Sequence, residues 1–262
     1  MTDLITITDD ENVRSIRFNR ADKKNAITQD MYAKMADGIE TAGDDGMRAI
    51  LFLGQSGVFS AGNDIADFLS RGMSNDMSAT ATVRFLKALA TTPTPILAAV
   101  DGLAIGVGAT MLMHCDMVFA SEEATLKTPF LHLGVVPEAA SSLIAPRIMG
   151  QQRAFEMLIM GETFSAERAR EAGLVNHVTS SDELEATAMA AAKKLSMLAP
   201  GALSISRKLL RGDPSDIIAR MDEEFVLFAE RLQSDEAVSY THLRAHETEA
   251  DLVCRLLLEK KN

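Results

Sequence analysis

The chain has 262 residues, of which 47% are hydrophobic and 24% charged, and its net charge is −11. This size and composition predict a single α/β domain, and the acidic charge argues against nucleic acid or an anionic membrane as a partner. No apolar run reaches the roughly eighteen residues of a membrane span, and the N-terminus lacks the features of a signal peptide, so we expect a soluble, cytoplasmic protein.

The first third of the chain predicts a β-hairpin, a helix and a buried strand. Residues 4–8 and 13–18 are rich in β-branched side chains and flank a polar turn at 9–12. A polar loop with Lys23 and Lys24 follows, and Thr28 is a plausible N-cap for a helix with an apolar face. Residues 49–53 predict a short buried strand that ends at Gly54.

A glycine-containing loop at residues 54–68 comes next. Ala61 and Gly62 allow the backbone to approach a ligand closely, and Asn63 or Asp64 can cap a helix that begins near Ile65. The free N–H groups of such a helix start would point at one place. Taken by itself, the pattern fits an ordinary capped helix equally well. A further helix is expected before Pro93 and Pro95.

The most informative stretch spans residues 98–142. An apolar strand leads through a glycine turn at Gly106, Val107 and Gly108 into a segment compatible with a helix. Exposed backbone N–H groups at the glycines and the positive end of the helix dipole would favour binding of an anion there. Glu138 then stands alone among small and apolar neighbours, as a general base often does, although a first-turn helix acid would look the same. His114 and its neighbours, Cys115 and Asp116, are expected to lie in a strand and to be structural.

The remaining sequence predicts mainly helices. Residues 143–149 and 154–160 favour two helices, Ser165 caps another that ends at Gly173, and residues 174–178 predict a strand. Ser180 and Glu183 form the pattern of a capping box before a helix that reaches about residue 198. A last helix is expected from residue 213 to about 234. Two scattered cysteines do not suggest a disulfide framework or a zinc site, so no metal is expected.

Residues 238–262 resemble the translation of a sequencing-library adapter. VSYTHLRAHET matches a transposase-type adapter, and LVCRLLLEKK matches its flow-cell end followed by a run of A. We therefore expect this segment to be foreign to the native protein. The alternative is a genuine amphipathic C-terminal helix, which the spacing of Leu252, Leu256 and Leu257 would allow. Amplification of the locus from source DNA decides between the two.

Four motifs in order resemble the crotonase superfamily, the enoyl-CoA hydratase and isomerase family. They are NRADKKNAIT, FSAGNDIADF, AAVDGLAIGVGATMLMHCD and MGETFSAERAREAGLVNHV. The resemblance covers residues 4–237 and implies an α/β fold of stacked ββα units. It divides the chain into a core at 1–198 and a helical trimerisation region at 199–237, and it implies a homotrimer or a dimer of trimers.

The same resemblance implies an acyl-CoA thioester as the substrate, with no separate cofactor because coenzyme A belongs to the substrate. The backbone N–H groups of Asn63 and Val107 would form an oxyanion hole, since two fixed donors stabilise the negative charge of an enolate. The residues expected to bind the substrate are Lys23, Ala26, Ala61, Gly62, Asp64, Ile65, Gly106 and Gly108.

The departures from the family pattern bear on the reaction. Hydratases of this family use two glutamates, whose positions fall here on Thr110 and Phe130. Glu138 instead resembles the catalytic base of the peroxisomal-type enoyl-CoA isomerases. The resemblance therefore implies conversion of 3-enoyl-CoA to trans-2-enoyl-CoA with one acid/base. Two alternatives stay open, namely another crotonase-type acyl-CoA reaction, such as hydration, and a non-catalytic scaffold that binds acyl-CoA. A C-terminal organelle signal also stays open if the native end is missing.

Overall fold

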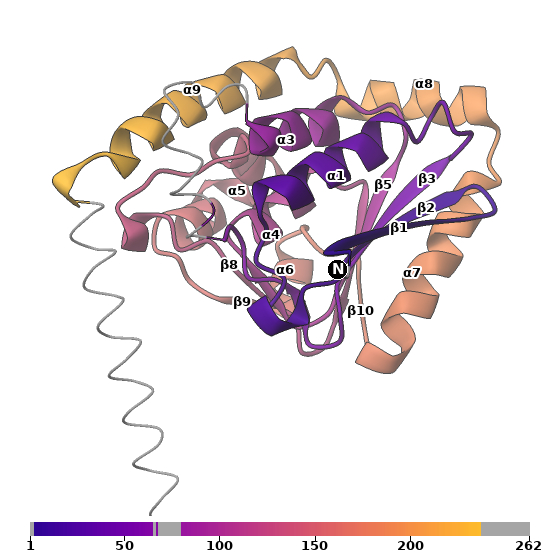
Figure 1. Ribbon diagram of the computed structural model, residues 1–262, viewed down its shortest axis with the longest axis horizontal. Coiled ribbons are helices and arrows are strands. Elements are labelled where there is room, and N and C mark those ends of the chain that lie inside the picture. The colour runs from indigo at the N-terminus through magenta and orange to yellow at the C-terminus, as the bar shows by residue number, and fades with distance from the viewer. Residues whose placement is uncertain (1–2, 65–66, 68–79, 237–262) are drawn as a thin grey trace, which may run out of the picture.

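Two β-sheets organise the computed structural model, which describes residues 3–64, 67 and 80–236 (Figure 1). The larger sheet has the strand order β1-β2-β3-β5-β7-β10 and the smaller one β4-β6-β8-β9. The strands of the larger sheet are β1 (Ile5–Asp10), β2 (Val13–Phe18), β3 (Ala49–Leu53), β5 (Ile96–Val100), β7 (Met117–Ser121) and β10 (His177–Thr179). Those of the smaller sheet are β4 (Val58–Ser60), β6 (Leu103–Ile105), β8 (Thr125–Lys127) and β9 (Phe164–Ser165).

The chain passes three times from the larger sheet to the smaller one and then into a helix. Thus β3 and β4 precede α3 (Ala81–Thr91), β5 and β6 precede α4 (Val107–Thr110), and β7 and β8 precede α5 (Ser141–Leu158). Strands that occupy equivalent places in this repeat pair in parallel within each sheet. The expected α/β fold of stacked ββα units is therefore present.

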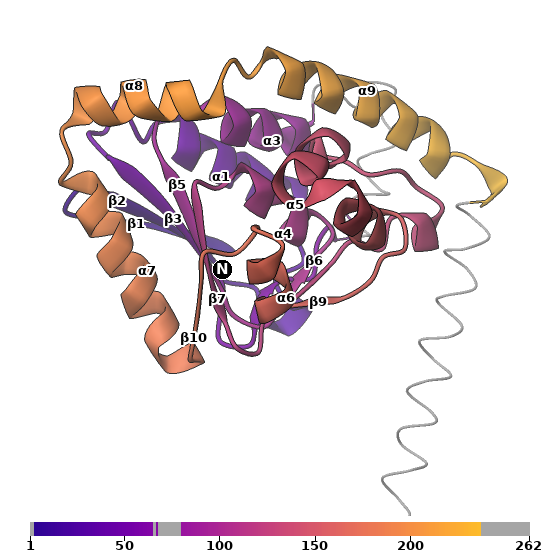
Figure 2. The same cartoon turned by 180° about the vertical axis from the view of Figure 1, so that it is seen from behind.

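Both faces of the larger sheet are buried, which explains why its central strands are apolar throughout. In β3, Ile50 and Phe52 belong to the cluster that includes residues of α1 (Gln29–Glu40) and α3. Alternate residues of the same strand, such as Leu51, pack with the cluster that includes Leu184 of α7 (Ser181–Ser196). Figures 1 and 2 show α1 and α3 together on one side of the sheet and α7 on the other.

Several predicted elements have the expected positions. The hairpin is antiparallel, Thr28 Oγ1 accepts a hydrogen bond from the Met31 N–H at 3.3 Å, and β3 has the predicted bounds. Ser165 caps α6 (Ala166–Glu171) through the Arg168 N–H. The two helices expected after residue 142 form α5, which has a kink at Gly150 with φ 78°.

Other predictions were wrong. The strand expected at 174–178 is shorter and later: it is β10, at residues 177–179. The N–H groups of residues 174 and 175 instead donate hydrogen bonds to the Ala169 carbonyl and so take no part in the sheet. Ser180 makes no side-chain cap, because the Glu183 N–H donates to the Ser180 backbone carbonyl at 3.2 Å. The Glu183 carboxylate accepts from the Thr179 hydroxyl, also at 3.2 Å. His114 ends a 3-10 helix, η3 (Met111–His114), and does not lie in a strand.

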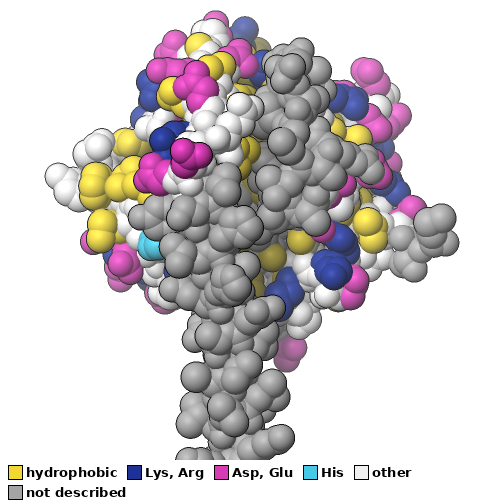
Figure 3. Space-filling view, turned by 60° about the vertical axis from the view of Figure 1, so that its left-hand side comes forward, with side chains coloured by type: hydrophobic (Ala, Val, Ile, Leu, Met, Phe, Trp, Pro, Cys, Tyr) yellow, Lys and Arg dark blue, Asp and Glu magenta, His cyan; other side chains and the backbone are white. Residues whose placement is uncertain are grey.

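Two long helices follow α7 and cross one edge of the molecule, as Figure 2 shows. They are α8 (Pro200–Arg211) and α9 (Ser215–Leu232). The boundary that we propose after residue 198 falls between α7 and α8, whereas the adapter-like segment 238–262 lies outside the described residues. In the described part of the chain, no helix is long and apolar enough to cross a membrane. Basic and acidic side chains are interspersed over the described surface in Figure 3.

Candidate active site

Two glycine loops meet at the end of the smaller sheet. Gly62 has φ 88°, and a Cβ at this position would lie only 2.8 Å from the Ile105 carbonyl oxygen and 3.9 Å from the Gly106 Cα. A side chain would therefore push the loops apart. This close approach brings Asn63, which follows Gly62, near Val107, which follows Gly106.

The N–H groups of Asn63 and Val107 are the donors expected in the oxyanion hole. Among the hydrogen bonds of the described residues, neither N–H has an acceptor, although the N–H groups of Gly62 and Asp64, on either side of Asn63, do. Val107 is the first residue of α4, and Gly106 before it has φ 55° and ψ −122°, a conformation open essentially to glycine alone. The buried Tyr32 hydroxyl donates to Asn63 Oδ1 at 2.6 Å and anchors that side chain. Two adjacent loops thus each present a bare backbone donor.

Glu138 is buried beside these loops, with 5% of its surface exposed. Its Oε1 accepts a hydrogen bond of 2.5 Å from the hydroxyl of Thr110 at the end of α4. Burial raises the pKa of Glu138 to about 8, while the Thr110 hydrogen bond acts in the opposite direction and the Glu224 carboxylate raises the pKa further. A carboxyl group of this kind can take up and return a proton near neutral pH.

The backbone after Glu138 has an unusual conformation. Ala139 and Ala140 have φ 61° and 54°, in the left-handed region that costs a residue with a Cβ about 1–2 kcal/mol. The His114 Nε2–H donates to the Ala139 carbonyl at 2.8 Å, and the Ala140 N–H donates to Glu224 Oε2 at 2.6 Å. Burial lowers the pKa of His114 to about 4, so its ring is neutral. Glu138 therefore precedes the cap of α5 and is not a first-turn helix acid.

A small pocket brings the predicted base and one predicted oxyanion residue together. Its free volume is about 10 Å³, and it is lined by Asn63, Thr80, Thr82, Val83, Glu138, Phe225 and Phe228. The two phenylalanines come from α9, so the C-terminal helical region closes the pocket over Glu138. Apolar side chains thus surround the Glu138 carboxyl group, and Asn63, Thr80 and Thr82 add polar groups to the same small space.

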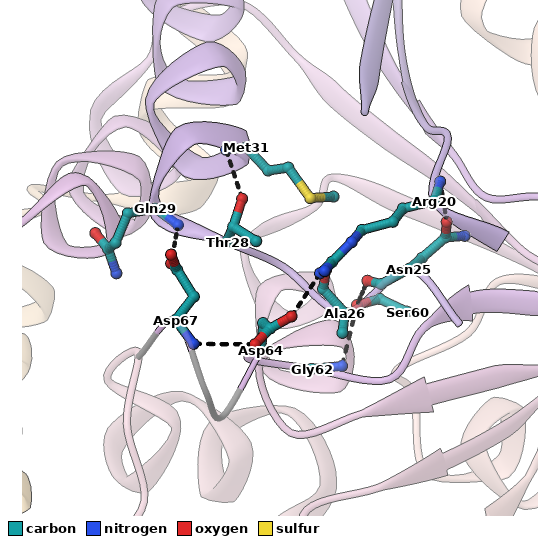
Figure 4. A network of polar contacts seen from close by, with 10 residues as sticks. All are labelled: Arg20, Asn25, Ala26, Thr28, Gln29, Met31, Ser60, Gly62, Asp64 and Asp67. Carbon is teal, nitrogen blue, oxygen red and sulfur yellow. Dashed lines mark hydrogen bonds and ion pairs between the residues drawn. The ribbon is translucent and has the colours of Figure 1, made fainter. Parts of the chain in front are cut away.

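The residues expected to bind the substrate lie on three segments, 23–26, 61–65 and 106–108, and Figure 4 shows parts of the first two. Asp64 forms an ion pair with Arg20 at 2.7 Å, and its Oδ1 accepts from the Asp67 N–H at 3.0 Å, so its carboxylate fixes the loop. Asp67 in turn accepts from the Gln29 N–H at the start of α1. Lys23 ends η1 (Ala21–Lys23) with an exposed side chain.

The other predicted contact residues have separate roles in the same loops. The Ala61 N–H donates to the Lys24 carbonyl, and the Ala26 carbonyl accepts from the Arg20 side chain. A Cβ on Gly108 would lie 3.0 Å from the Ser60 carbonyl, so α4 also packs tightly against β4. Ile65 lies outside the described residues. The contacts of all these residues with a substrate stay predictions.

Two residues beside this site carry no signal in the sequence. Glu224 lies 84 positions from Ala140, and a glutamate in an amphipathic helix resembles any exposed acid. Tyr32 lies on the apolar face of α1 and looks like a core residue. In contrast, His132, six residues before Glu138, is exposed. Among the described residues, no three His, Cys, Asp or Glu side chains gather to hold a metal ion.

The comparisons with known proteins agree with this geometry. Residues 8–239 match the family model described as enoyl-CoA hydratase/isomerase. A solved structure of an enoyl-CoA hydratase/isomerase from Pseudoalteromonas atlantica T6c is 39% identical, with a TM-score of 0.88. That alignment covers 94% of this chain and 98% of the other.

Two curated relatives carry isomerase names. Enoyl-CoA delta isomerase 2 of Rattus norvegicus is 35% identical over 224 residues, which cover 84% of this chain and 57% of the rat protein. Enoyl-CoA delta isomerase 3, peroxisomal, of Mus musculus is 34% identical over 237 residues, which cover 88% of this chain and 75% of the mouse protein. The chain thus spans little more than half the length of the rat relative.

Proposed function

Because the chain belongs to the enoyl-CoA hydratase/isomerase family, we propose that it converts 3-enoyl-CoA thioesters to trans-2-enoyl-CoA with Glu138 as the single acid/base. The observation that carries the proposal is the buried Glu138 carboxyl, which shares a pocket with Asn63 and has a pKa raised to about 8. The isomerase names of the rat and mouse relatives support the same reaction.

In the proposed mechanism, ionised Glu138 removes a proton from C2 of the bound 3-enoyl-CoA. The electron pair delocalises through the thioester, and the N–H groups of Asn63 and Val107 stabilise the negative oxygen of the dienolate. The same carboxyl then returns the proton at C4, which leaves the double bond between C2 and C3. Atoms and charge balance without a cofactor, because the coenzyme A that activates the substrate is part of it.

The residues at the two positions that carry glutamates in the hydratases support isomerisation over hydration. These positions hold Thr110 and Phe130, and Thr110 is a hydrogen-bond donor to Glu138. Glu224 is another buried acid nearby, but its oxygens accept from the Ala140 and Ser142 N–H groups. A carboxylate held in this way does not activate water.

The test is a conversion assay with trans-3-hexenoyl-CoA, run beside hydration of crotonyl-CoA. We expect formation of 2-hexenoyl-CoA with negligible hydration. Glu138→Gln keeps the size of the side chain but removes the base, so kcat should fall by about 10²–10⁴-fold. Circular dichroism and binding of a CoA ester would show that the variant is folded and still binds.

Two other outcomes identify the remaining alternatives. Hydration that depends on Glu138 and exceeds isomerisation would assign the chain to a hydratase-type reaction. Binding of CoA esters without turnover of either substrate would favour a scaffold, and Glu138 would lose its proposed role.

We also propose that the protein assembles as a trimer or a dimer of trimers through its C-terminal helical region. Ile205, Leu209 and Leu210 of α8 are 64%, 80% and 89% exposed. The same helix turns Arg207 and Arg211 inward, where they contact Asp116 and the His114 carbonyl. The apolar side chains on the exposed face of this helix favour contact with an apolar partner surface.

A further inference from the structure

Glu224 of α9 lies against the turn that carries Glu138. Its Oε2 accepts from the Ala140 N–H at 2.6 Å, and its Oε1 accepts from the N–H and the hydroxyl of Ser142, at 3.1 and 2.5 Å. Only 4% of Glu224 is exposed. One carboxylate thus satisfies three donors at the beginning of α5, a helix whose own N-cap residue, Ala140, has no side-chain acceptor to offer.

This capping arrangement is physically demanding. Ala139 and Ala140 are both left-handed, and each costs about 1–2 kcal/mol relative to a right-handed residue. Such a conformation persists only where its surroundings hold it. Here the His114 ring binds the Ala139 carbonyl on one side, and the Glu224 carboxylate binds the following N–H groups on the other. The positive end of the α5 dipole further favours an anion at this place.

From this geometry we propose that Glu224 is a positioning residue, which holds the left-handed turn and so aims the Glu138 carboxyl into the pocket. This inference rests on the proposed function and adds to it a residue from the C-terminal helical region. Glu224 is connected to Glu138 through only a few backbone groups. Ala140, which Glu224 binds, lies two residues after Glu138, and the Glu138 carbonyl accepts from the Ser141 N–H at 3.0 Å. A displaced turn would displace the base.

The charged groups that face Glu224 come from its own helix and from the turn. Arg220, one turn earlier on α9, donates to the Ser142 hydroxyl at 3.1 Å and pairs with Glu223. Glu138 faces it from the turn. Burial raises the pKa of Glu224 to about 7, while the hydrogen bonds from Ser142 and Ala140 and the charge of Arg220 act in the opposite direction. Its charge in turn contributes to the raised pKa of Glu138.

The decisive variant is Glu224→Gln in the full chain. Glutamine offers a single oxygen, so at least one of the Ala140 and Ser142 N–H groups loses its acceptor. The matched control is Glu230→Gln, the same change at an exposed position on the same helix. We expect kcat for trans-3-hexenoyl-CoA to fall about a hundredfold in Glu224→Gln with little change in KM, because misplacing a base by about 1 Å has an effect of that size. Glu230→Gln should resemble the wild type.

Two further measurements separate positioning from a general loss of folding. Removal of the Glu224 charge should shift the midpoint of the pH profile of kcat/KM to lower pH, since that charge raises the pKa of Glu138. Amide hydrogen exchange over residues 138–144 should become roughly tenfold faster, as expected when a backbone hydrogen bond is lost. A variant that merely contained less folded protein would show an unchanged midpoint.

The outcomes distinguish the two proposals. Faster exchange at residues 138–144, in a protein whose wild type does not isomerise 3-enoyl-CoA, would overturn the proposed reaction but keep Glu224 as the holder of the turn. Wild-type isomerase activity together with unchanged kcat, pH midpoint and exchange in Glu224→Gln would overturn the inference. Equal losses in Glu224→Gln and Glu230→Gln would also overturn it.

Discussion

Glu138 combines properties that oppose each other. As a buried acid it destabilises the fold when ionised, whereas the proposed chemistry requires the ionised form. Thr110 reduces the conflict by donating a hydrogen bond to the carboxyl group at 2.5 Å. Thr110 therefore favours the ionised form of the proposed base.

This conflict predicts how stability depends on pH. The pKa of Glu138 is about 8 in the folded chain, against 4.5 for an unperturbed glutamate. Between these values the folded state binds the extra proton, so the contribution of Glu138 to the free energy of unfolding falls as pH rises. Glu138→Gln should therefore match the wild type near pH 4.5 and be more stable by roughly 1–3 kcal/mol above pH 8.

Differential scanning calorimetry of both proteins between about pH 5 and pH 9 measures this effect. The difference in Tm should grow steadily with pH. A difference that stayed constant over the whole range would contradict a raised pKa for Glu138 and would indicate an effect on packing alone.

Among the structural elements, the two glycine loops form the site only because they approach each other closely. Gly62 and Gly46 both have positive φ, 88° and 81°. A Cβ added to Gly62 would lie 2.8 Å from a neighbouring backbone oxygen, whereas one added to Gly46 would meet nothing within 4 Å. The pair therefore separates conformational strain from loop contact.

We expect Gly46→Ala to cost about 1 kcal/mol of stability and to leave activity unchanged. Gly62→Ala should cost more and also reduce kcat by about a hundredfold, because it separates the Asn63 and Val107 donors. Urea unfolding and the hexenoyl-CoA assay measure the two effects. Similar activity in both variants would show that the approach of the loops is not required.

The predicted elements succeeded where local rules act alone and failed where another group competed. Partly alternating β-branched residues predicted the hairpin, a continuous apolar run predicted β3, and Thr28 caps α1 as expected. The capping box does not form because the Glu183 N–H donates to the Ser180 backbone carbonyl instead of its hydroxyl, while the Glu183 carboxylate accepts from the Thr179 hydroxyl. The sequence predicted no separate helix at α8, where Arg207 and Arg211 face the protein while Leu209 and Leu210 are exposed.

For the molecule as a whole, the exposed face of α8 predicts assembly. Burying a leucine side chain contributes about 1.5–3 kcal/mol, and three copies of the face would bury several. Leu209→Glu should therefore reduce the mass in light scattering from a multiple of 28.3 kDa toward that of one chain. Ser206→Glu, on the same helix and also exposed, is the control and should keep the assembly. A wild-type chain that is already monomeric would contradict the proposal.

The α/β class, the two glycine loops and most of the helices could be predicted from the sequence, because each depends on residue type and short-range spacing. The stacked ββα fold and the proposed role of Glu138 followed from the resemblance of four motifs to a family, and α8 was not predicted. The surroundings of that carboxyl could not. Thr110 is 28 positions away from Glu138, and Glu224 is 84 positions from Ala140, so no local pattern could join them. The raised pKa and the held turn both arise from burial between α4, α5 and α9, which exists only once the chain has folded.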